Sequence, residues 1–506
     1  MLMHRLLVAA AERRPERIAF RWVDRDRALT YVEAVDAMER MAGALAALGV
    51  GKGDRVTLFA HNGLDYLVAM LGAWRLGAIS ALVNVRFADE LDYYFADHTP
   101  KVVVYTHDMH GPVRAAALRA ASPPRLVCMD GPQEGAESLP DLMAAALPAP
   151  ADPADEAAIA HLSYTSGTTG KPKGACLAHE PTIRAARCIG ERLRIRSDDV
   201  SFGPTALSSS YQLAANLLPE LAAGATINVM GKWSQAAGWD AIDKAGATLF
   251  VANPPVLEEV LAESRLRGRT PGRLRFTLSG GGPVPSTLKI AFRDELKLPL
   301  VESYGQSELG GFVALGYPEL EPDNARLMRV GPMLPDKQVA AFDLQDRELP
   351  NGRLGELGLR GGFMAGYWGK SDKTKEATRG AWLRTGDVGF LDEDGFITMR
   401  GRRVELIEVA GVTWFPRDVE EALCRVPGVR LAALIGQPDA VLGASPAAFV
   451  TLDAGVALNG AALKAAIEGQ TPYDLTPLIV TVVERLPMTP TGKISKAELA
   501  AEHRHS

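Results

Sequence analysis

Residues 163–174 read Ser163-Tyr-Thr-Ser-Gly-Thr-Thr-Gly-Lys-Pro-Lys-Gly174. This stretch contains three glycines, five serine or threonine hydroxyls and two lysines, and it has almost no apolar side chain to bury. Backbone N–H groups, hydroxyls and ammonium groups in a glycine-rich loop are the donors that bind an oxyanion such as a polyphosphate. The composition therefore predicts a phosphate-binding loop, with a flexible polar linker as the structural alternative.

The spacing within this loop excludes a Walker A motif. That motif requires a glycine, four further residues and then Gly-Lys followed by Ser or Thr. Here two residues separate Gly167 from Gly170, and Lys171 is followed by Pro172. The loop is thus of another phosphate-binding type, and the remaining blocks of the chain decide which.

Composition narrows the class of protein. A chain of 506 residues predicts about three structural units. Lys+Arg 55 and Asp+Glu 61 give a formal net charge of −6, so no basic excess favours nucleic acid. The four cysteines, at positions 128, 176, 188 and 424, lack CxxC spacing, which argues against a zinc ribbon or a disulfide framework. His107 and His110 have no evident third ligand, so we interpret them as a surface pair.

Targeting and membrane signals are weak. Residues 1–11 have only a short apolar run, which is too short for a signal peptide. Arg75 interrupts the most apolar later stretch, residues 66–83, so no membrane span is predicted. We expect a soluble cytoplasmic protein, and the sequence leaves open whether it forms a homodimer.

The periodicity predicts an α/β fold with a large N-terminal domain, residues 1–401, of parallel sheets covered by helices. Thr30-Tyr-Val-Glu33 is a capping box that opens a helix. Predicted strands alternate with predicted helices, which indicates right-handed crossovers; the strands are 56–60, 79–85, 101–105 and 248–252, and the helices are 65–76 and 255–264. Residues 133–158 are expected to be an exposed connection.

After Arg402 the pattern changes to that of a small mobile α+β domain, residues 402–506. The predicted strands are 431–435, 447–451 and 479–483, and the predicted helices are 416–425, 463–468 and 495–502. Lys493 follows Pro490 and Gly492 in a loop, so its ammonium is available to a partner surface or simply faces solvent.

Two blocks follow predicted strand ends, where open α/β sheets place their sites. Gly280, Gly281 and Gly282 let a flat ligand lie against the backbone, although a tight turn would also explain them. Tyr304-Gly-Gln-Ser-Glu308 supplies an aromatic plane, a hydroxyl and a carboxylate. A carboxylate together with phosphate oxygens is the usual way to hold magnesium; a surface glutamate is the alternative.

A third block surrounds a predicted hairpin over residues 388–399, whose turn is Asp392–Gly395. Asp387 precedes this hairpin and Arg402 follows it. An aspartate can accept two hydrogen bonds from vicinal hydroxyls, so a ribose is a natural partner. A surface salt bridge between exposed residues is the alternative.

These blocks and their order resemble the adenylate-forming superfamily, which includes acyl- and aryl-CoA synthetases, luciferases and nonribosomal adenylation domains. The matching segments span nearly the whole chain: 164–174, 280–282, 304–308, 355–361, 385–387, 401–402 and 490–493. The likeness is greatest to acyl- or aryl-CoA ligases.

The resemblance implies a role for each block. The phosphates of ATP would be held by Thr165, Ser166, Gly167, Thr168, Thr169, Gly170, Lys171 and Lys173. Adenine and ribose would contact Gly280, Gly281, Gly282, Tyr304, Gly305, Asp387 and Arg402. The catalytic set would be Lys493, which neutralises the forming acyl phosphate, Glu308, which binds Mg²⁺, and the adjacent Ser307. Gly411 would lie beside the pantetheine of coenzyme A.

The acyl pocket is expected at Ser208, Ser209, Tyr211 and Gly282. This segment departs from the family, which usually carries an aromatic residue or a histidine there; small hydroxyls leave room for a bulky acid or donate hydrogen bonds to a polar one. No acidic residue occurs between Gly203 and Pro219. A buried substrate ammonium would lack a counter-ion, so amino-acid activation is disfavoured. Ser307 replaces the usual threonine, and Val404 replaces the usual polar hinge residue.

The sequence thus predicts an ATP-dependent acid:CoA ligase that uses ATP, Mg²⁺ and coenzyme A to activate a non-amino acid, aromatic, alicyclic or of medium chain length. A carboxylate cannot expel oxide, so activation through an acyl-adenylate is required. One alternative is transfer to the phosphopantetheine of a carrier protein. Another, prompted by Val404, is a nucleotide-binding protein without turnover.

Overall fold

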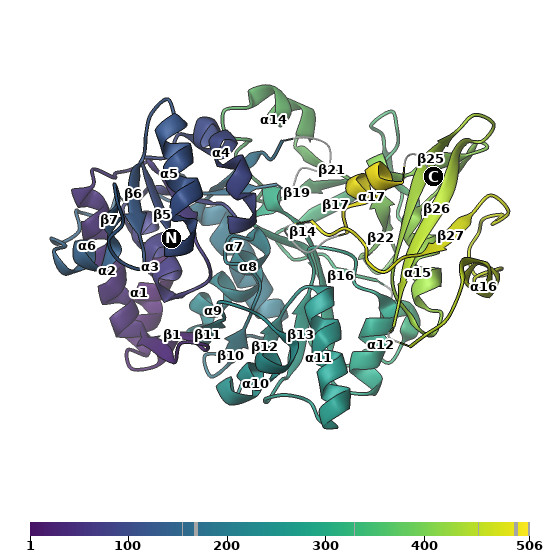
Figure 1. The fold of residues 1–506 in the computed structure, drawn as a ribbon, viewed down its shortest axis with the longest axis horizontal. Coiled ribbons are helices and arrows are strands. Elements are labelled where there is room, and N and C mark those ends of the chain that lie inside the picture. The colour runs from purple at the N-terminus through teal and green to yellow at the C-terminus, as the bar shows by residue number, and fades with distance from the viewer. Residues whose placement is uncertain (154, 166–170, 328, 454, 490–493, 504–506) are drawn as a thin grey trace.

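The structure is a computed structural model, and it describes residues 1–153, 155–165, 171–327, 329–453, 455–489 and 494–503. These residues form four β-sheets. Figure 1 shows the first half of the chain on the left and centre and the C-terminal elements on the right. No helix among the described residues is both long enough and apolar enough to cross a bilayer.

The first sheet carries the strands that flank the loop of residues 165–173. Its order is β7-β6-β5-β3-β4-β8-β9, and all neighbours are parallel except β8 and β9. The strands are β3 (Arg55–Phe59), β4 (Ile79–Leu82), β5 (Val102–Tyr105), β6 (Arg125–Cys128), β7 (Glu137–Ser138), β8 (Ile159–Tyr164) and β9 (Gly174–Ala178). Every residue of β5 is buried, as expected for a parallel strand covered on both faces.

The second sheet has the order β15-β14-β13-β12-β10-β11-β1-β2 and is parallel except at its two edges. Its strands are β1 (Ile18–Trp22), β2 (Arg27–Thr30), β10 (Val200–Phe202), β11 (Thr226–Val229), β12 (Leu249–Val251), β13 (Phe276–Ser279), β14 (Leu300–Gln306) and β15 (Gly311–Leu315). Ser279 of β13 pairs with Glu302 of β14. The segments that follow these residues therefore emerge at the same edge.

Helices join these two sheets into one body. Helix α3 (Leu64–Arg75) contacts β1 of one sheet and β3 of the other. The largest hydrophobic core includes residues of both sheets together with α1 (His4–Arg13), α2 (Tyr31–Ala47) and α9 (Leu218–Ala223). The predicted capping box of α2 is present, because Thr30 accepts from the Glu33 N–H and Glu33 accepts from the Thr30 N–H.

The remaining helices of this part cover the outer faces or connect strands. They are α4 (Leu91–His98), α5 (His110–Arg119), α6 (Leu139–Ala144), α7 (His179–Arg192), α8 (Ser210–Asn216), α10 (Gln235–Ala245), α11 (Pro254–Arg267), α12 (Ser286–Asp294) and α13 (Asn324–Leu327), with 3-10 turns η1 (Val85–Glu90), η2 (His107–Met109) and η3 (Ser307–Leu309). Residues 133–158 are not only a connection as expected: they contain β7 and α6, because Ser138 caps the helix and Leu139 is buried.

A third sheet, of antiparallel strands, follows. It contains β16 (Gly331–Pro332), β17 (Gln338–Phe342), β18 (Glu348–Leu349), β19 (Gly355–Arg360), β20 (Thr378–Arg379), β21 (Trp382–Leu391) and β22 (Phe396–Arg402), and α14 (Ser371–Ala377) precedes β20. The predicted hairpin is confirmed by the pairing of Leu391 with Ile397. The sequence alone did not predict a separate sheet here. Where a tight turn joins two of its strands, as between β21 and β22, the reversal of the chain makes the pairing antiparallel.

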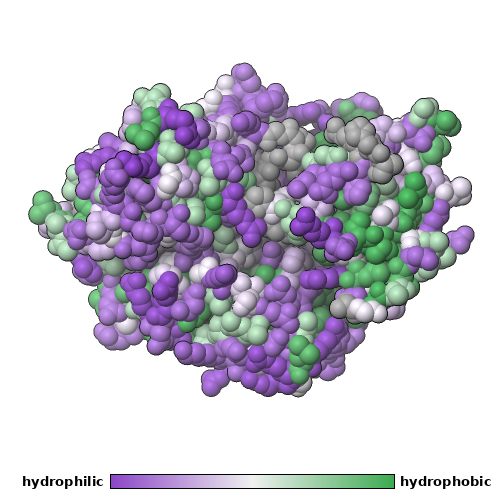
Figure 2. Space-filling view, viewed as in Figure 1, coloured by the Kyte–Doolittle hydropathy of each residue, from purple (hydrophilic) through white to green (hydrophobic). Residues whose placement is uncertain are grey.

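The last sheet has its own core. It contains β23 (Ile407–Val409), β24 (Val412–Trp414), β25 (Val429–Asp439), β26 (Gly443–Leu452) and β27 (Ile479–Val482), packed with α15 (Pro416–Cys424), α16 (Gly460–Ala466) and α17 (Lys496–Glu502). The 3-10 turn η4 (Arg403–Glu405) precedes it, and Val404 within that turn is exposed. Figure 2 shows a mostly hydrophilic face, with a hydrophobic area over these C-terminal strands, where Ile479 and Val482 of β27 are exposed.

The α/β fold with a smaller C-terminal α+β unit is therefore confirmed. The strands and helices expected from periodicity occur at the expected places, with ends shifted by a few residues. The third sheet is the main addition to the predicted architecture.

Candidate active site

The predicted phosphate loop closes a hairpin between β8 and β9. Tyr164 pairs with Gly174, the Thr165 N–H donates to the Lys173 carbonyl at 3.0 Å, and the Lys173 N–H donates to Thr165 Oγ1 at 3.3 Å. A Cβ at Gly174 would lie 3.3 Å from Cζ of Tyr164, so the glycine permits this close approach. Ser166, Gly167, Thr168, Thr169 and Gly170 lie outside the described residues.

The segment 364–370 runs along β9 and brings a tyrosine into the site. The Ala365 N–H donates to the Cys176 carbonyl, and the Cys176 N–H donates to the Gly366 carbonyl, both at 2.9 Å. The Trp368 N–H donates to the Gly174 carbonyl at 2.8 Å. Tyr367 is therefore held next to the loop by main-chain hydrogen bonds on both sides of it.

Tyr367 touches two of the predicted site residues. Its hydroxyl donates to Oε1 of Glu308 at 2.7 Å, and the Nζ of Lys173 lies 4.4 Å from the centre of its ring. Burial and the neighbouring Glu308 carboxylate raise the pKa of Tyr367 above its usual range, so the phenol stays protonated. Glu308 belongs to η3 and is half-buried.

The second lysine of the loop has a similar environment. The Nζ of Lys171 lies 5.0 Å from the ring centre of Tyr93, whose hydroxyl donates to the Pro172 carbonyl. Such cation–π contacts contribute about 0.5–1 kcal/mol at exposed sites. In the part of the chain that the structure describes, neither Lys171 nor Lys173 forms an ion pair.

A buried hydrogen-bond chain supports the start of the loop. The Tyr164 hydroxyl donates to Oδ2 of Asp97 at 2.8 Å and lies 2.8 Å from Nδ1 of His98. The other ring nitrogen of His98 lies 2.6 Å from the Thr57 hydroxyl. Burial lowers the pKa of His98 to about 3, so the ring is neutral, donates through Nδ1 and accepts at Nε2. Lys370 forms an ion pair with Asp97.

The predicted ribose site is assembled around Asp387. Its Oδ2 accepts hydrogen bonds from the Tyr304 hydroxyl and from Nε2 of Gln306, both at 2.7 Å. Its Oδ1 lies 3.1 Å from Nε of Arg402, which is the residue directly opposite on β22. Asp387 is only 5% exposed, so these donors compensate the charge that burial would otherwise penalise. The two predicted residues, Asp387 and Arg402, are thus brought together.

The Asp387 carboxylate shifts the pKa values of its two neighbours, Tyr304 and Arg402. Burial and the Asp387 carboxylate raise the pKa of Tyr304 well above its usual value, so the phenol remains a donor. The Asp387 carboxylate raises the pKa of Arg402, although burial opposes this shift. Gly305, beside Tyr304, admits no side chain, because a Cβ there would lie 2.5 Å from the Gly311 carbonyl oxygen.

The glycine block lies against Tyr211, the predicted acyl-pocket residue. A Cβ at Gly280 would lie 2.2 Å from Oγ of Ser303 and 3.1 Å from Cε2 of Tyr211. Gly281 has a φ of +77°, a conformation that glycine adopts without strain. Gly282 follows and is half-buried.

The predicted acyl segment, residues 208–211, contacts the segment 304–308, which carries the predicted magnesium ligand, through two serines. Ser209 caps α8 by accepting from the Tyr211 N–H at 3.2 Å, and Ser208 precedes it, half-buried. The Tyr211 hydroxyl donates to the Leu278 carbonyl at 3.2 Å. The Oγ of Ser210 lies 3.2 Å from the Oγ of Ser307, which places α8 beside residues 304–308.

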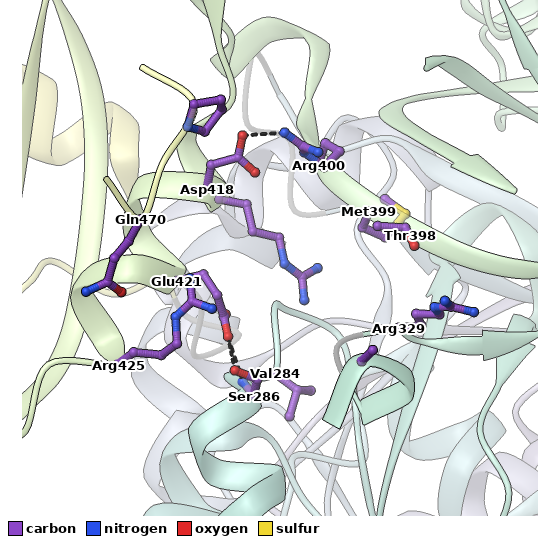
Figure 3. A pocket seen from close by; sticks show the side chains of 13 residues that line it. Val284, Ser286, Arg329, Thr398, Met399, Arg400, Asp418, Glu421, Arg425 and Gln470 are labelled. Carbon is purple, nitrogen blue, oxygen red and sulfur yellow. Dashed lines mark hydrogen bonds and ion pairs between the residues drawn. The ribbon is translucent and has the colours of Figure 1, made fainter. Parts of the chain in front are cut away.

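A cavity of about 380 Å³ lies between the larger part of the molecule and the C-terminal sheet (Figure 3). Figure 3 shows Arg400 and Asp418 pointing toward one another, and Ser286 toward Glu421. The Ser286 N–H also donates to Oε1 of Glu421 at 3.1 Å. These contacts hold α15 against β22 and the start of α12.

Two predictions about the C-terminal part are not tested by this geometry. Lys493 lies outside the described residues. Gly411 has a φ of +81° in the turn between β23 and β24, and no described atom lies within 4 Å of the position that a Cβ would take. In this arrangement Gly411 faces open space.

Sequence reasoning missed four residues of the site: Tyr93, Asp97, Gln306 and Tyr367. Gln306 lies within the 304–308 block, but no role was predicted for it. The run Tyr367-Trp-Gly-Lys370, which combines aromatic rings, a glycine and a lysine, was an available signal. Tyr93 and Asp97 lie on one helix, with no local pattern that links them to the loop.

The residues present fit magnesium in a site completed by phosphate. No group of three or more His, Cys, Asp or Glu side chains that could hold a metal occurs among the described residues. Mg²⁺ is commonly held by one or two carboxylates together with substrate phosphates and water. Glu308 would supply that carboxylate, and the Tyr367 hydroxyl, which donates to it, would help to orient it.

Comparisons with known proteins agree with this geometry. A family model described as AMP-binding enzyme matches residues 7–368, and one described as AMP-binding enzyme C-terminal domain matches residues 418–493. The chain is 30% identical over 475 residues to a feruloyl-CoA synthase from Amycolatopsis, covering 93% of each chain. It is also 30% identical to the fatty acid–[acyl-carrier-protein] ligase ScoC from Streptomyces coeruleorubidus, covering 94% of this chain and 91% of that one.

Among solved structures, ATP-bound MatB from Rhodopseudomonas palustris is similar with a TM-score of 0.88 and 26% identity, covering 100% of this chain and 99% of that chain. The whole chain, both its larger part and its C-terminal sheet, therefore shares this architecture. On these matches the chain belongs to the AMP-binding enzyme family, and it is an enzyme of the acid–thiol ligase type.

Proposed function

We propose that this enzyme is an ATP-dependent acid:CoA ligase that acts through an acyl-adenylate. The observation that carries the proposal is the convergence of Lys173, Glu308 and the Asp387–Arg402 pair: Tyr367 contacts both Lys173 and Glu308, and the charge of Arg402 acts on Tyr367 and is itself influenced by Glu308. A phosphate-binding loop, a metal-binding carboxylate and a ribose-binding carboxylate are the groups that adenylation requires.

The first step activates the acid. Its carboxylate oxygen attacks the α-phosphorus of ATP, the bond to the bridging oxygen breaks, and pyrophosphate leaves. Lys171, Lys173 and Lys493 would lower the repulsion between the two anions, and electrostatic stabilisation of this kind is often the largest catalytic term. Magnesium, when bound at Glu308, supplies Lewis-acid neutralisation of the phosphate oxygens.

The second step transfers the acyl group. The thiolate of coenzyme A attacks the carbonyl carbon, the anhydride bond breaks and AMP leaves, while the thiol proton passes to solvent. We propose that residues 402–506 form a mobile unit that reorients for this step, with Arg402 near the hinge and Gly411 beside the pantetheine. The exposure of residues 410–412 supports such a role.

The proposed substrate is a non-amino carboxylic acid with an aromatic, alicyclic or medium-length tail. The proposal is supported by the small side chains of Ser208, Ser209 and Gly282, which are half-buried and lie in the same segments as Tyr211 and Gly280. No carboxylate lies between Gly203 and Pro219 to pair with a substrate ammonium. A cytoplasmic location stays a prediction, and whether the protein forms a homodimer stays open.

Pyrophosphate release and acyl-CoA formation, measured across a panel of acids, test the proposal. We expect both products with at least one aromatic, alicyclic or medium-chain acid. Pyrophosphate and adenylate without any thioester would contradict the acid:CoA ligase.

The likeness to the carrier-protein ligase of Streptomyces coeruleorubidus supports an alternative acceptor for the acyl group. In this alternative the same adenylate is transferred to the phosphopantetheine of a carrier protein. Parallel assays with free coenzyme A and with a holo-carrier protein separate the two acceptors.

A third hypothesis is a protein that binds nucleotide without turnover. The retained Glu308, Lys493 and complete loop oppose it. A protein that binds ATP but releases no pyrophosphate with any acid would support it.

A further inference from the structure

The two lysines of the phosphate loop, Lys171 and Lys173, face aromatic rings instead of carboxylates. Lys171 lies over Tyr93 and Lys173 over Tyr367, with Nζ-to-centroid distances of 5.0 and 4.4 Å. Lys370 differs in its charge partner: it also lies over the Tyr93 ring, 5.9 Å from its centre, but it forms an ion pair with Asp97. A lysine that is already paired with a carboxylate must lose that partner before it can neutralise a phosphate, whereas a lysine over a ring keeps its charge available.

Tyr367 stands between groups of opposite charge. Its hydroxyl donates to Glu308 at 2.7 Å, while its ring face holds the ammonium of Lys173. Opposite charges at such short range attract strongly in a partly desolvated site. A direct Lys173–Glu308 ion pair would withdraw both groups from the ATP phosphates and from magnesium. Among the described residues no such pair forms, and each group contacts Tyr367 instead.

The backbone fixes the ring in this position. Main-chain hydrogen bonds from Ala365 and Trp368 attach the segment to β9, and the Met364 N–H donates to the Glu308 carbonyl at 2.6 Å. Tyr367 is 7% exposed, so its side chain has little freedom to turn away. The same short segment thus positions both the tyrosine and the carboxylate that it contacts.

We infer that Tyr367 is a positioning residue that keeps Lys173 and Glu308 apart and presents both to the phosphates of magnesium-bound ATP. This inference rests on the proposed function. It assigns to Tyr367 two separable tasks: the hydroxyl orients Glu308, and the ring face holds Lys173.

Two variants of the full-length protein separate these tasks. Tyr367→Phe keeps the ring and removes the hydroxyl, whereas Tyr367→Leu removes both. ATP binding is measured by calorimetry, first without magnesium and then as a function of magnesium chloride concentration. We expect Tyr367→Phe to bind magnesium-free ATP within about twofold of wild type but to require about three- to tenfold more magnesium. Tyr367→Leu is expected to lose about fivefold in magnesium-free ATP affinity as well.

Tyr317 provides a matched control. It is half-exposed and stacks on Arg192 at 4.7 Å, so Tyr317→Leu also removes a cation–π contact, but one outside the site. We expect wild-type ATP and magnesium binding for this variant. A loss that equals that of Tyr367→Leu would show a general effect of removing a ring and would overturn the inference.

The outcomes distinguish the inference from the proposed function. If the wild-type protein binds no ATP, the proposed function fails. If wild type binds ATP and both Tyr367 variants match it with and without magnesium, the inference alone is overturned. Should Tyr367→Leu fail to fold, Tyr367→Phe decides: a purely structural role would lower its melting temperature and leave its magnesium dependence unchanged.

Discussion

Asp387 and Arg402 face each other as paired residues of β21 and β22, and Nε of Arg402 lies 3.1 Å from Oδ1 of Asp387. Tyr304 and Gln306, from a different sheet, donate to the other carboxylate oxygen of Asp387. The carboxylate therefore joins two sheets and is held in one orientation before any nucleotide arrives. Such preorganisation reduces the ordering that binding must impose on the site.

Replacement of the Asp387 carboxylate should weaken the binding of ATP but not that of the acid. Asp387→Asn keeps the shape but removes the charge and turns one acceptor into a donor, which then meets Arg402 or Tyr304. Hydrogen bonds to charged groups contribute about 1.5–3 kcal/mol, so we expect the KM for ATP to rise about ten- to hundredfold. The KM for the acid should stay within about twofold, as measured by initial rates with each substrate varied.

Asp439→Asn is the matched control for that variant, because Asp439 accepts two backbone N–H bonds in an exposed turn of the C-terminal sheet. Its kinetic constants should equal those of wild type. An unchanged KM for ATP in Asp387→Asn would exclude Asp387 from nucleotide binding.

Lys493→Ala should affect only the first half-reaction. Loss of a cation that stabilises the transition state costs about two to three orders of magnitude in rate. We expect this loss in pyrophosphate release, while thioester formation from a supplied acyl-adenylate remains near wild type. Lys375→Ala, at an exposed position of α14, serves as the control. Equal loss in both half-reactions of Lys493→Ala would contradict an adenylation-specific role.

Gly280→Ala should disturb the boundary between the predicted adenine site, to which Gly280 belongs, and the predicted acyl residue Tyr211, which lies 3.1 Å from the new Cβ. The new Cβ would lie 2.2 Å from Oγ of Ser303 and 2.9 Å from its carbonyl oxygen, so Ser303 or Tyr211 must move. Overpacking of this kind costs about 1–3 kcal/mol of stability. We expect a lower melting temperature and a raised KM for the acid, read from thermal unfolding and steady-state rates.

Gly111→Ala tests whether any added methyl has this effect, because among the described residues no atom beyond the helix's own backbone and the adjacent residues lies within 4 Å of a Cβ at that position. Its KM for the acid should match wild type, and its melting temperature should stay the same or rise, because alanine favours helix α5 (His110–Arg119) more than glycine does. A Gly280→Ala protein that retains the wild-type KM for the acid would place the acyl group elsewhere.

Glu220 should make stability depend on pH. Burial raises the pKa of Glu220 to about 8 in the folded protein, against an ordinary value of 4.5. Between these values the unfolded chain has released the proton and the folded chain has kept it, so the free energy of unfolding falls as pH rises, by about 1.4 kcal/mol per pH unit. Glu220→Gln removes this dependence.

The melting temperature of Glu220→Gln relative to wild type should therefore increase from pH 5 to about pH 8 and level off above it. Glu468→Gln, at an exposed position after α16, should show no such trend. A difference between Glu220→Gln and wild type that does not vary with pH would mean that Glu220 ionises normally in the folded state.

Much of the fold could be predicted because its signals are local. The Thr30–Glu33 capping box, the four consecutive buried residues of β5 and the turn at Asp392–Gly395 each depend on neighbours within a few positions. The third sheet was not predicted because, apart from the β21–β22 hairpin, its pairings join separate segments, such as β16 with β22 and β19 with β21. A strand pairing between distant segments leaves no periodicity that a single stretch of sequence reveals.

Some residues of the candidate site could likewise be predicted from local sequence, and others could not. Residues 163–174, the three glycines, Glu308, Asp387 and Arg402 were identifiable from residue type and order, since phosphate, ribose and magnesium each require particular donors and acceptors. Gln306 and Tyr367 were not, because their roles depend on partners 81 and 59 residues away.

The amino-acid sequence by itself determined the family, the order of its motifs and the chemistry that each motif can offer. Tertiary structure alone decided which groups are committed and which are available: Lys370 is neutralised by Asp97, whereas Lys171 and Lys173 lie over tyrosine rings. The physical reason is that a side chain's charge acts over a few ångströms, and only the folded backbone sets which charges come within that range.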